Sequence, residues 1–187
     1  DLATHNTNNS YSMIFGRMVN ADVQNIALSG MGMVTGWNTA IFAPQVWNRY
    51  APMARGNLAD LKAWTPDVVF TNFGENDASY SQANGSPFPE AYTETYIKYI
   101  QELRKTWPTA KIVILRGGMY HGKNDPALAQ AVDAVRSAFA DDKLIYGYNF
   151  VRSSNTHPRV SAHRDMAEEL VQFFKQTDGL KDLVPSK

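Results

Sequence analysis

The run Asp67-Val68-Val69-Phe70-Thr71-Asn72-Phe73, directly after Pro66, predicts a β-strand that is buried on both faces. Continuous apolar runs of this kind are typical of strands in parallel sheets. A second such run is Lys111-Ile112-Val113-Ile114-Leu115. Between the two, residues 90–107 predict a helix, because apolar side chains recur there at helical spacing: Tyr92, Tyr96, Tyr99, Ile100 and Leu103. A strand, a helix and a strand in this order indicate a parallel βαβ unit.

The sequence on either side extends this pattern. It predicts two further strands, Asp22–Leu28 and Lys143–Tyr148, and a polar loop over Gly74–Pro89. A first helix would begin after Asn8, Asn9 or Ser10, with Tyr11, Ile14, Phe15 and Met18 on its apolar side. Two later helices are predicted. One begins at Asp125-Pro126, and the other spans Ser161–Gln176. We therefore expect one α/β domain over residues 1–187, a three-layer αβα sandwich with helices on both faces of a parallel sheet.

Composition excludes several classes of protein. The chain of 187 residues has 18 Lys plus Arg, 18 Asp plus Glu and no Cys, and 44% of it is hydrophobic. A neutral chain without a basic run is not expected to bind nucleic acid or an anionic membrane. The absence of Cys excludes disulfides and cysteine nucleophiles, and no apolar stretch approaches the roughly 20 residues of a membrane span. The first residue is Asp1 rather than Met, so we expect a processed or trimmed product.

Ligand sites of open parallel sheets lie beyond the carboxyl ends of the strands. The predicted strands deliver Gly30, Asn76 and His157 to that edge. A glycine turn, an amide and an imidazole are components of an acyl-transfer site, as a backbone N–H donor, a side-chain donor and a general base. Each also has a plainer interpretation, as a chain turn, a helix-capping turn or a surface histidine. Glu75 and Asp77 are too close in sequence to suit a glycosidase pair, and the histidines lack metal-ligand spacing, so no metal is expected.

Three blocks in order resemble the SGNH (GDSL-type) hydrolase superfamily: residues 25–32 (Asn-Ile-Ala-Leu-Ser-Gly-Met-Gly), residues 69–77, and His157-Pro158 with residues 162–167. The first block is most similar to that of acetyl-xylan esterases of carbohydrate esterase family two. The resemblance implies a flavodoxin-like parallel sheet of order 2-1-3-4-5 and a serine-dependent ester hydrolase that needs no cofactor. Gly30 and Asn76 would then donate hydrogen bonds to the oxyanion, and His157 would be the general base.

The sequence departs from the superfamily pattern in two places. Ser154 stands where most members have the Asp of a triad, which fits the Ser–His dyad of carbohydrate esterase family two. The nucleophile block Gly-Asp-Ser is absent, and Ser10, Ser12 and Ser29 are poor substitutes. The strands found here would be strands two to five, without the central first strand. We therefore expect a companion N-terminal segment, either a separate fragment of the same precursor or a part omitted from this chain, to supply strand one and the serine.

The leading functional hypothesis is a carbohydrate O-acetyl esterase that acts on an acylated carbohydrate or a small ester. Trp37, Trp47, Tyr80 and Tyr120 could stack on sugar rings, with packing as the alternative role. The runner-up is a catalytically inactive binding or scaffolding domain. A nucleotide binder ranks last, because no glycine-rich phosphate loop follows a strand. The triplets Asn8-Asn9-Ser10 and Asn84-Gly85-Ser86 are potential N-glycosylation sites and, with the start at Asp1, indicate a secreted protein.

Overall fold

The computed structural model describes residues 6–38, 40–54 and 56–185. At its centre is a parallel sheet of three strands, β1 (Val68–Thr71), β2 (Lys111–Met119) and β3 (Ile145–Ser154), in the order β1-β2-β3. Val68 lies opposite Lys111, and Ile112 lies opposite Ile145. The predicted α/β class with a parallel sheet is therefore confirmed. The order 2-1-3-4-5 goes beyond these three strands and stays a prediction.

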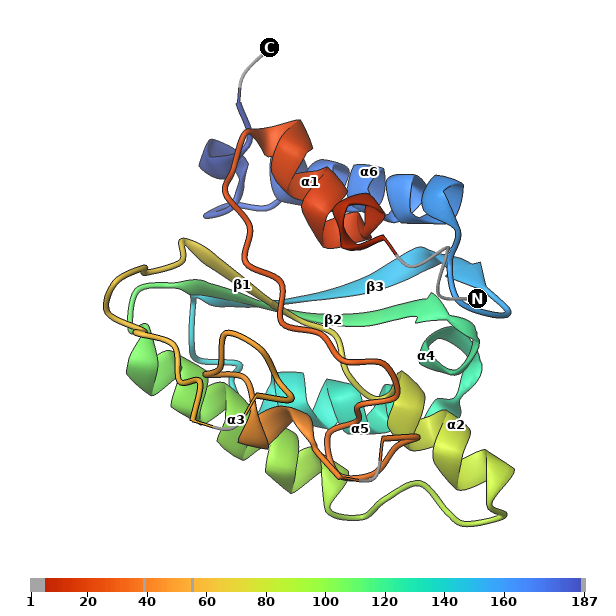
Figure 1. Cartoon of the computed structure of the whole chain (residues 1–187). Helices are drawn as coiled ribbons and strands as arrows, with labels where there is room; N and C mark the ends of the chain where they lie inside the picture. The colour runs from red at the N-terminus through yellow and green to blue at the C-terminus, as the bar shows by residue number, and fades with distance from the viewer. Residues whose placement is uncertain (1–5, 39, 55, 186–187) are drawn as a thin grey trace.

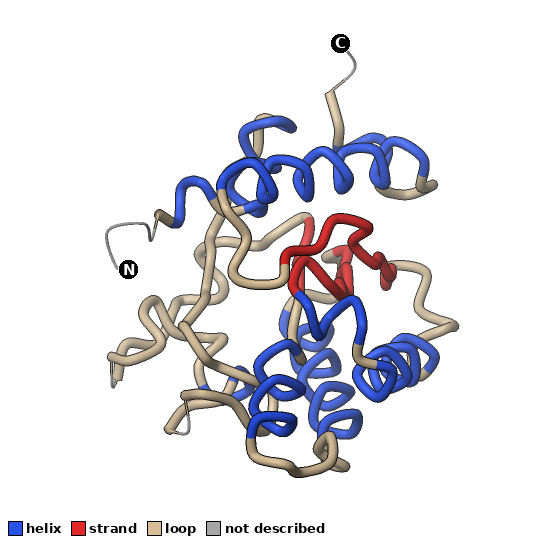
Figure 2. The backbone as a smooth tube through the Cα atoms, turned by 90° about the vertical axis from the view of Figure 1, so that its right-hand side faces the viewer, coloured by secondary structure: helices blue, strands red, loops and turns tan. Residues whose placement is uncertain are grey.

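Helices cover both faces of the sheet (Figures 1 and 2). Helices α1 (Tyr11–Val19) and α6 (Val160–Gln176) form one layer, and α3 (Tyr92–Thr106) and α5 (Pro126–Ser137) form the other. Helices α2 (Glu75–Ala83) and α4 (Tyr120–Asn124) lie at the carboxyl end of the sheet, since each begins just after a strand. Short 3-10 turns occupy Thr7–Asn9, Ala43–Gln45 and Lys181–Leu183. Among the described residues, no helix has the length and apolar character needed to cross a bilayer.

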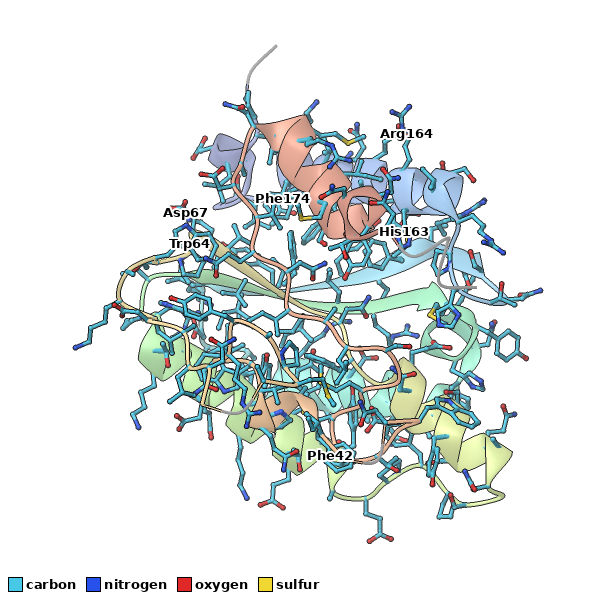
Figure 3. The ribbon with its side chains drawn as sticks, viewed as in Figure 1. Phe42, Trp64, Asp67, His163, Arg164 and Phe174 are labelled. Atoms are coloured by element: carbon cyan, nitrogen blue, oxygen red, sulfur yellow. The ribbon has the colours of Figure 1, made fainter. Side chains whose placement is uncertain are left out.

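Alternate side chains of β2 supply the two cores that hold these layers together. Val113 and Leu115 face the α1–α6 layer, where Phe174 packs edge-on against Phe15 with ring centroids 4.9 Å apart. Figure 3 shows Phe174 and His163 directed from α6 toward the sheet, and Arg164 directed away from it. On the other face the Tyr96 hydroxyl donates to Thr71 Oγ1 at 2.8 Å, which ties α3 to the end of β1.

The predicted strand Asp22–Leu28 is wrong. These residues form no ladder, and most of them are exposed. The segment runs from the α1–α6 layer to the α3–α5 layer past the β1 side of the sheet (Figures 1 and 2). Within the described part of the chain, β1 pairs with β2 alone. A strand requires a hydrogen-bonded neighbour, and apolar residues alone do not create one.

Other boundaries also differ from the predictions. Residues 74–89, expected to be a polar loop, contain α2. On α1 the predicted apolar residue Met18 is 38% exposed, and Val19 is buried in its place. Strands β2 and β3 extend to Met119 and Ser154, beyond their apolar runs. A bulge allows this extension, because the β3 residue opposite β2 moves from Asn149 to Ser153 between Arg116 and Gly118. Gly117 and Gly118 have φ of 103° and 94°, a backbone conformation that favours glycine.

Candidate active site

A buried carboxylate just after the carboxyl end of β1 holds part of the segment 30–38. Asp77 is 0% exposed and lies in the first turn of α2. It accepts hydrogen bonds from the backbone N–H groups of three successive residues, Met33, Val34 and Thr35, at 2.9–3.1 Å. Burial raises the pKa of Asp77, and the bonds from these N–H groups act in the opposite direction. Asp77 therefore fixes the loop that carries Gly30.

Gly30 and Asn76 lie side by side as a result of this anchoring. The Asn76 amide Nδ2 donates to the Met31 carbonyl at 2.9 Å. A Cβ on Gly36 would lie 2.5 Å from the Gly30 carbonyl oxygen and 3.4 Å from Asn76 Cβ, so both residues border the same point. The Asn76 amide carries a second hydrogen. The Gly30 N–H donates no hydrogen bond to any described residue. The Gly30 N–H and the second Asn76 amide hydrogen therefore both lie without a partner among the described residues.

A second carboxylate of α2 holds α4 at the same edge. Glu75 accepts from the backbone N–H groups of His121 and Gly122, at 3.1 and 2.5 Å. Tyr120, the first residue of α4, is 46% exposed and contacts the His121 ring edge-on. Glu75 and Asp77 therefore each hold a backbone segment in place. The sequence alone did not indicate this structural role.

His157 lies in the loop between β3 and α6, and its side chain is exposed. It has no hydrogen-bond partner in the part of the chain that the structure describes. Ser154, three residues earlier, is the last residue of β3. His163 is different, since its Nδ1 accepts from the Tyr11 N–H at 3.3 Å and burial lowers its pKa. His157 is thus exposed in the loop after β3, whereas His163 joins α6 to α1.

No described serine hydroxyl hydrogen-bonds to a histidine. Ser10 Oγ and Ser12 Oγ contact each other at 3.1 Å at the start of α1, and Ser29 is exposed beside Gly30. The structure therefore brings Gly30 and Asn76 together, places His157 in the loop that leaves the same edge of the sheet, and pairs none of the three serines with a base.

Two of the four aromatic candidates lie together at this edge. Trp37 is 57% exposed, its Nε1 donates to Ser79 Oγ at 2.9 Å, and its ring meets Tyr80 edge-on at 5.5 Å. Trp47 does not join them, because its ring packs against Tyr99 of α3 and against Trp107 just after that helix. Trp107 follows α3 and precedes β2, so Trp47 lies near the amino ends of the strands. For Trp47 the structure thus shows packing, the second of the two roles that the sequence left open.

Among the described residues, no three His, Asp or Glu side chains are arranged to hold a metal ion. The carboxylates at this edge are engaged with backbone N–H groups. What the edge offers chemically is a pair of hydrogen-bond donors, an exposed imidazole and aromatic side chains. This set suits the polarisation of a carbonyl group and proton transfer.

Comparison with known proteins agrees with this chemistry. The chain is 25% identical over 179 residues to an acetylxylan esterase/glucomannan deacetylase of Cellvibrio japonicus, covering 91% of this chain and 49% of that protein. It is 30% identical over 182 residues to the cellulase/esterase CelE of Acetivibrio thermocellus, covering 91% of this chain and 22% of that protein. The chain thus spans about half or less of the length of these curated relatives.

Solved structures of carbohydrate esterases are also similar to this chain. A family two carbohydrate esterase from Clostridium thermocellum, in complex with cellohexaose, superimposes with a TM-score of 0.80 and 26% identity, over 91% of this chain and 54% of that chain. A family two carbohydrate esterase from Cellvibrio japonicus has the same fold, with a TM-score of 0.80 and 24% identity, over 95% of this chain and 53% of that chain. Residues 2–176 match the GDSL-like Lipase/Acylhydrolase family. The chain therefore belongs to the GDSL-like lipase/acylhydrolase family and is similar to the carbohydrate esterases of family two.

Proposed function

We propose that this chain provides the oxyanion donors, the base and the substrate-facing aromatic residues of a serine-dependent carbohydrate O-acetyl esterase. The observation that carries the proposal is the loop anchored by Asp77, which lies with Gly30 beside the Asn76 amide. Family membership and the named esterase relatives support the same reaction class. Trp37, Tyr80 and Tyr120 are the proposed sugar contacts, because they lie at this edge and expose part of their rings.

The proposed reaction uses a Ser–His dyad. His157 removes the proton from the serine hydroxyl as its oxygen attacks the acetyl carbonyl carbon. The Gly30 N–H and the Asn76 amide hold the oxyanion, and His157 then protonates the sugar oxygen as the C–O bond breaks. Water, deprotonated by the same imidazole, attacks the acyl-enzyme. Acetate leaves, and the serine recovers its proton.

The serine is proposed to come from a companion N-terminal segment that pairs with the outer edge of β1. Two observations support this position. Strand β1 pairs on one side alone among the described residues, and the Asp22–Leu28 segment, which passes on its other side, forms no ladder (Figures 1 and 2). An added strand between them would satisfy backbone groups on both sides. We also propose that the assembled enzyme works outside the cell, since polymeric esters are too large to enter one.

The test is hydrolysis of 4-nitrophenyl acetate and acetylated xylan by the protein assembled with its serine-bearing segment. Asn76→Ala should lower kcat about 100-fold or more, the usual cost of one oxyanion donor. His157→Ala should abolish turnover, and Arg159→Ala, which alters an exposed residue just beyond Pro158, should leave it unchanged. Full activity of His157→Ala would remove this residue from the mechanism.

A catalytically inactive binding domain is the second candidate, and the absence of a described Ser–His contact favours it. A serine-reactive fluorophosphonate distinguishes the two functions. Labelling of the assembled protein that requires His157 supports the esterase. Absence of labelling in a folded protein that still binds acetylated xylan supports the binding domain.

A further inference from the structure

A groove of about 870 Å³ lies outside the candidate active site, between α6 and the edge of β3 that has no strand partner among the described residues. It reaches from Ser153, close to the carboxyl end of β3, along α6 from Asp165 to Gln176. Eleven helical steps of 1.5 Å make this side about 16 Å long. A groove of this length suits an extended ligand of several units.

The floor of the groove is aromatic. The rings of Tyr148 and Phe173 lie with their centroids 4.7 Å apart at 37°, and both are partly exposed. The Tyr148 hydroxyl donates to Glu169 at 3.0 Å, which fixes the position of its ring. Val151, 72% exposed, extends the apolar strip toward the carboxyl end of β3. Such a floor presents flat apolar area at low conformational cost, because its side chains are already held in place.

The rim of the groove is polar without a dominant charge. Gln172, Gln176 and Glu168 are exposed and offer both donors and acceptors. The lining includes two basic and three acidic side chains. Of these, Arg152 pairs with Asp165 at 3.2 Å, and Glu169 is engaged with the backbone. A ligand rich in hydroxyl groups matches this rim better than a phosphate or a strongly charged polymer does.

An outer strand edge such as that of β3 can bind a peptide as an added strand. Backbone groups at Val151 and Arg152, within the groove, are already occupied. The N–H groups of Val151 and Arg152 both donate to Glu169 at 2.7 Å, and the Val151 carbonyl accepts from Lys123 Nζ at 3.1 Å. Recognition in this groove therefore falls to its side chains.

We propose that this groove binds a segment of neutral polysaccharide, outside the acetyl-ester site. The inference rests on the proposed function in taking the substrate to be a polysaccharide. Because the groove begins next to the carboxyl end of β3, one polymer chain can occupy it and continue toward the edge that carries His157. The groove then raises the local concentration of acetylated sugar units at that edge.

The test is an NMR titration of the full chain with xylohexaose and with cellohexaose. We expect saturable shifts of the backbone amides of residues 148–153 and 168–176. The double variant Gln172→Ala/Gln176→Ala should raise Kd about tenfold, as expected for the loss of two hydrogen bonds. Phe173→Leu, which keeps most of the volume but removes the ring, should weaken binding as well. Gln101→Ala, an exposed glutamine of α3, is the matched control and should leave Kd unchanged.

Shifts confined to residues 30–38, 76–80 and 157, or an unchanged Kd in both groove variants, would overturn the proposal. The esterase assay separates its failure from that of the proposed function. Groove variants that hydrolyse 4-nitrophenyl acetate normally but act more slowly on dilute acetylated xylan support the groove. Binding in the groove by a protein without esterase activity would refute the proposed function and retain the groove.

Discussion

Removal of the Asp77 carboxylate should release the loop that carries Gly30. In Asp77→Ala, the N–H groups of Met33, Val34 and Thr35 lose their common acceptor. An unsatisfied buried donor costs about 1–3 kcal/mol, and water can reach the half-buried Val34 and Thr35, so we expect a loss of about 3–5 kcal/mol. This is a large share of the roughly 5–15 kcal/mol that stabilises a typical domain.

Asp77→Asn gives a graded comparison. One amide oxygen can still accept from Val34 and Thr35, which both bond to Oδ1, whereas the amide nitrogen would face the Met33 N–H. Burial raises the pKa of Asp77, so removing its charge recovers part of the desolvation cost. We therefore expect a smaller loss for Asn, about 1.5–3 kcal/mol, the value of one hydrogen bond to a charged group.

Urea unfolding measures the global effect, and amide hydrogen exchange of residues 33–35 measures the local one. Both variants should speed exchange at these amides under native conditions, with the Ala variant faster than the Asn variant. Asp141→Ala, at an exposed carboxylate, is the control. If exchange at residues 33–35 in Asp77→Ala stays at the parental rate, the reasoning that Asp77 holds this loop is refuted.

Three other perturbations test the remaining contacts. Burial lowers the pKa of His163, so the unfolded chain binds more protons below pH 6.5, and the free energy of unfolding should fall as the pH drops from 7 toward 5. His163→Gln should flatten this dependence, and equal slopes would contradict the assignment. Gly32→Ala places a Cβ 1.7 Å from the Thr35 carbonyl oxygen and should lower the free energy of unfolding by more than about 3 kcal/mol. The control Gly85→Ala, where no neighbour lies within 4 Å, should cost about 1 kcal/mol. Equal urea midpoints for the two variants would exclude the clash. Glu169→Ala should lower the free energy of unfolding by about 2–4 kcal/mol, because two backbone donors and the Tyr148 hydroxyl lose their acceptor, and retained exchange protection at Val151 and Arg152 would count against this contact.

Elements with a strong local signal could be predicted from the sequence. Helices α3, α5 and α6 follow their apolar spacing, and Asp125 caps α5 by accepting from the Leu128 N–H at 2.9 Å. Helix α2 gave no such signal, because its buried residues include the polar Asp77 and Ser81. The sequence 22–28 has strand-forming residues, but strand formation depends on a neighbour that local sequence cannot supply.

The candidate site was predictable where a motif marked it and obscure elsewhere. The glycine-bearing block and Asn76 were assigned to one edge, and the structure joins them through the Met31 carbonyl. The part played by Asp77 could not be seen, because its partners lie more than 40 residues earlier and are backbone groups that leave no mark on composition. The role of Trp47 stayed open in the sequence because an aromatic residue in a loop can face either solvent or core.

The first turn of α2 separates the parts of the site that must stay constant from those that can vary. Glu75 and Asp77 hold their neighbours entirely through main-chain N–H groups, so the fixed geometry does not depend on which side chains those neighbours carry. Trp37 and Tyr120 project from the two segments held in this way. Substitutions at Trp37 and Tyr120 can therefore change the surface at this edge while Gly30 and Asn76 keep their positions. A library restricted to these outward residues would test the proposed sugar contacts without disturbing the backbone around Gly30 and Asn76.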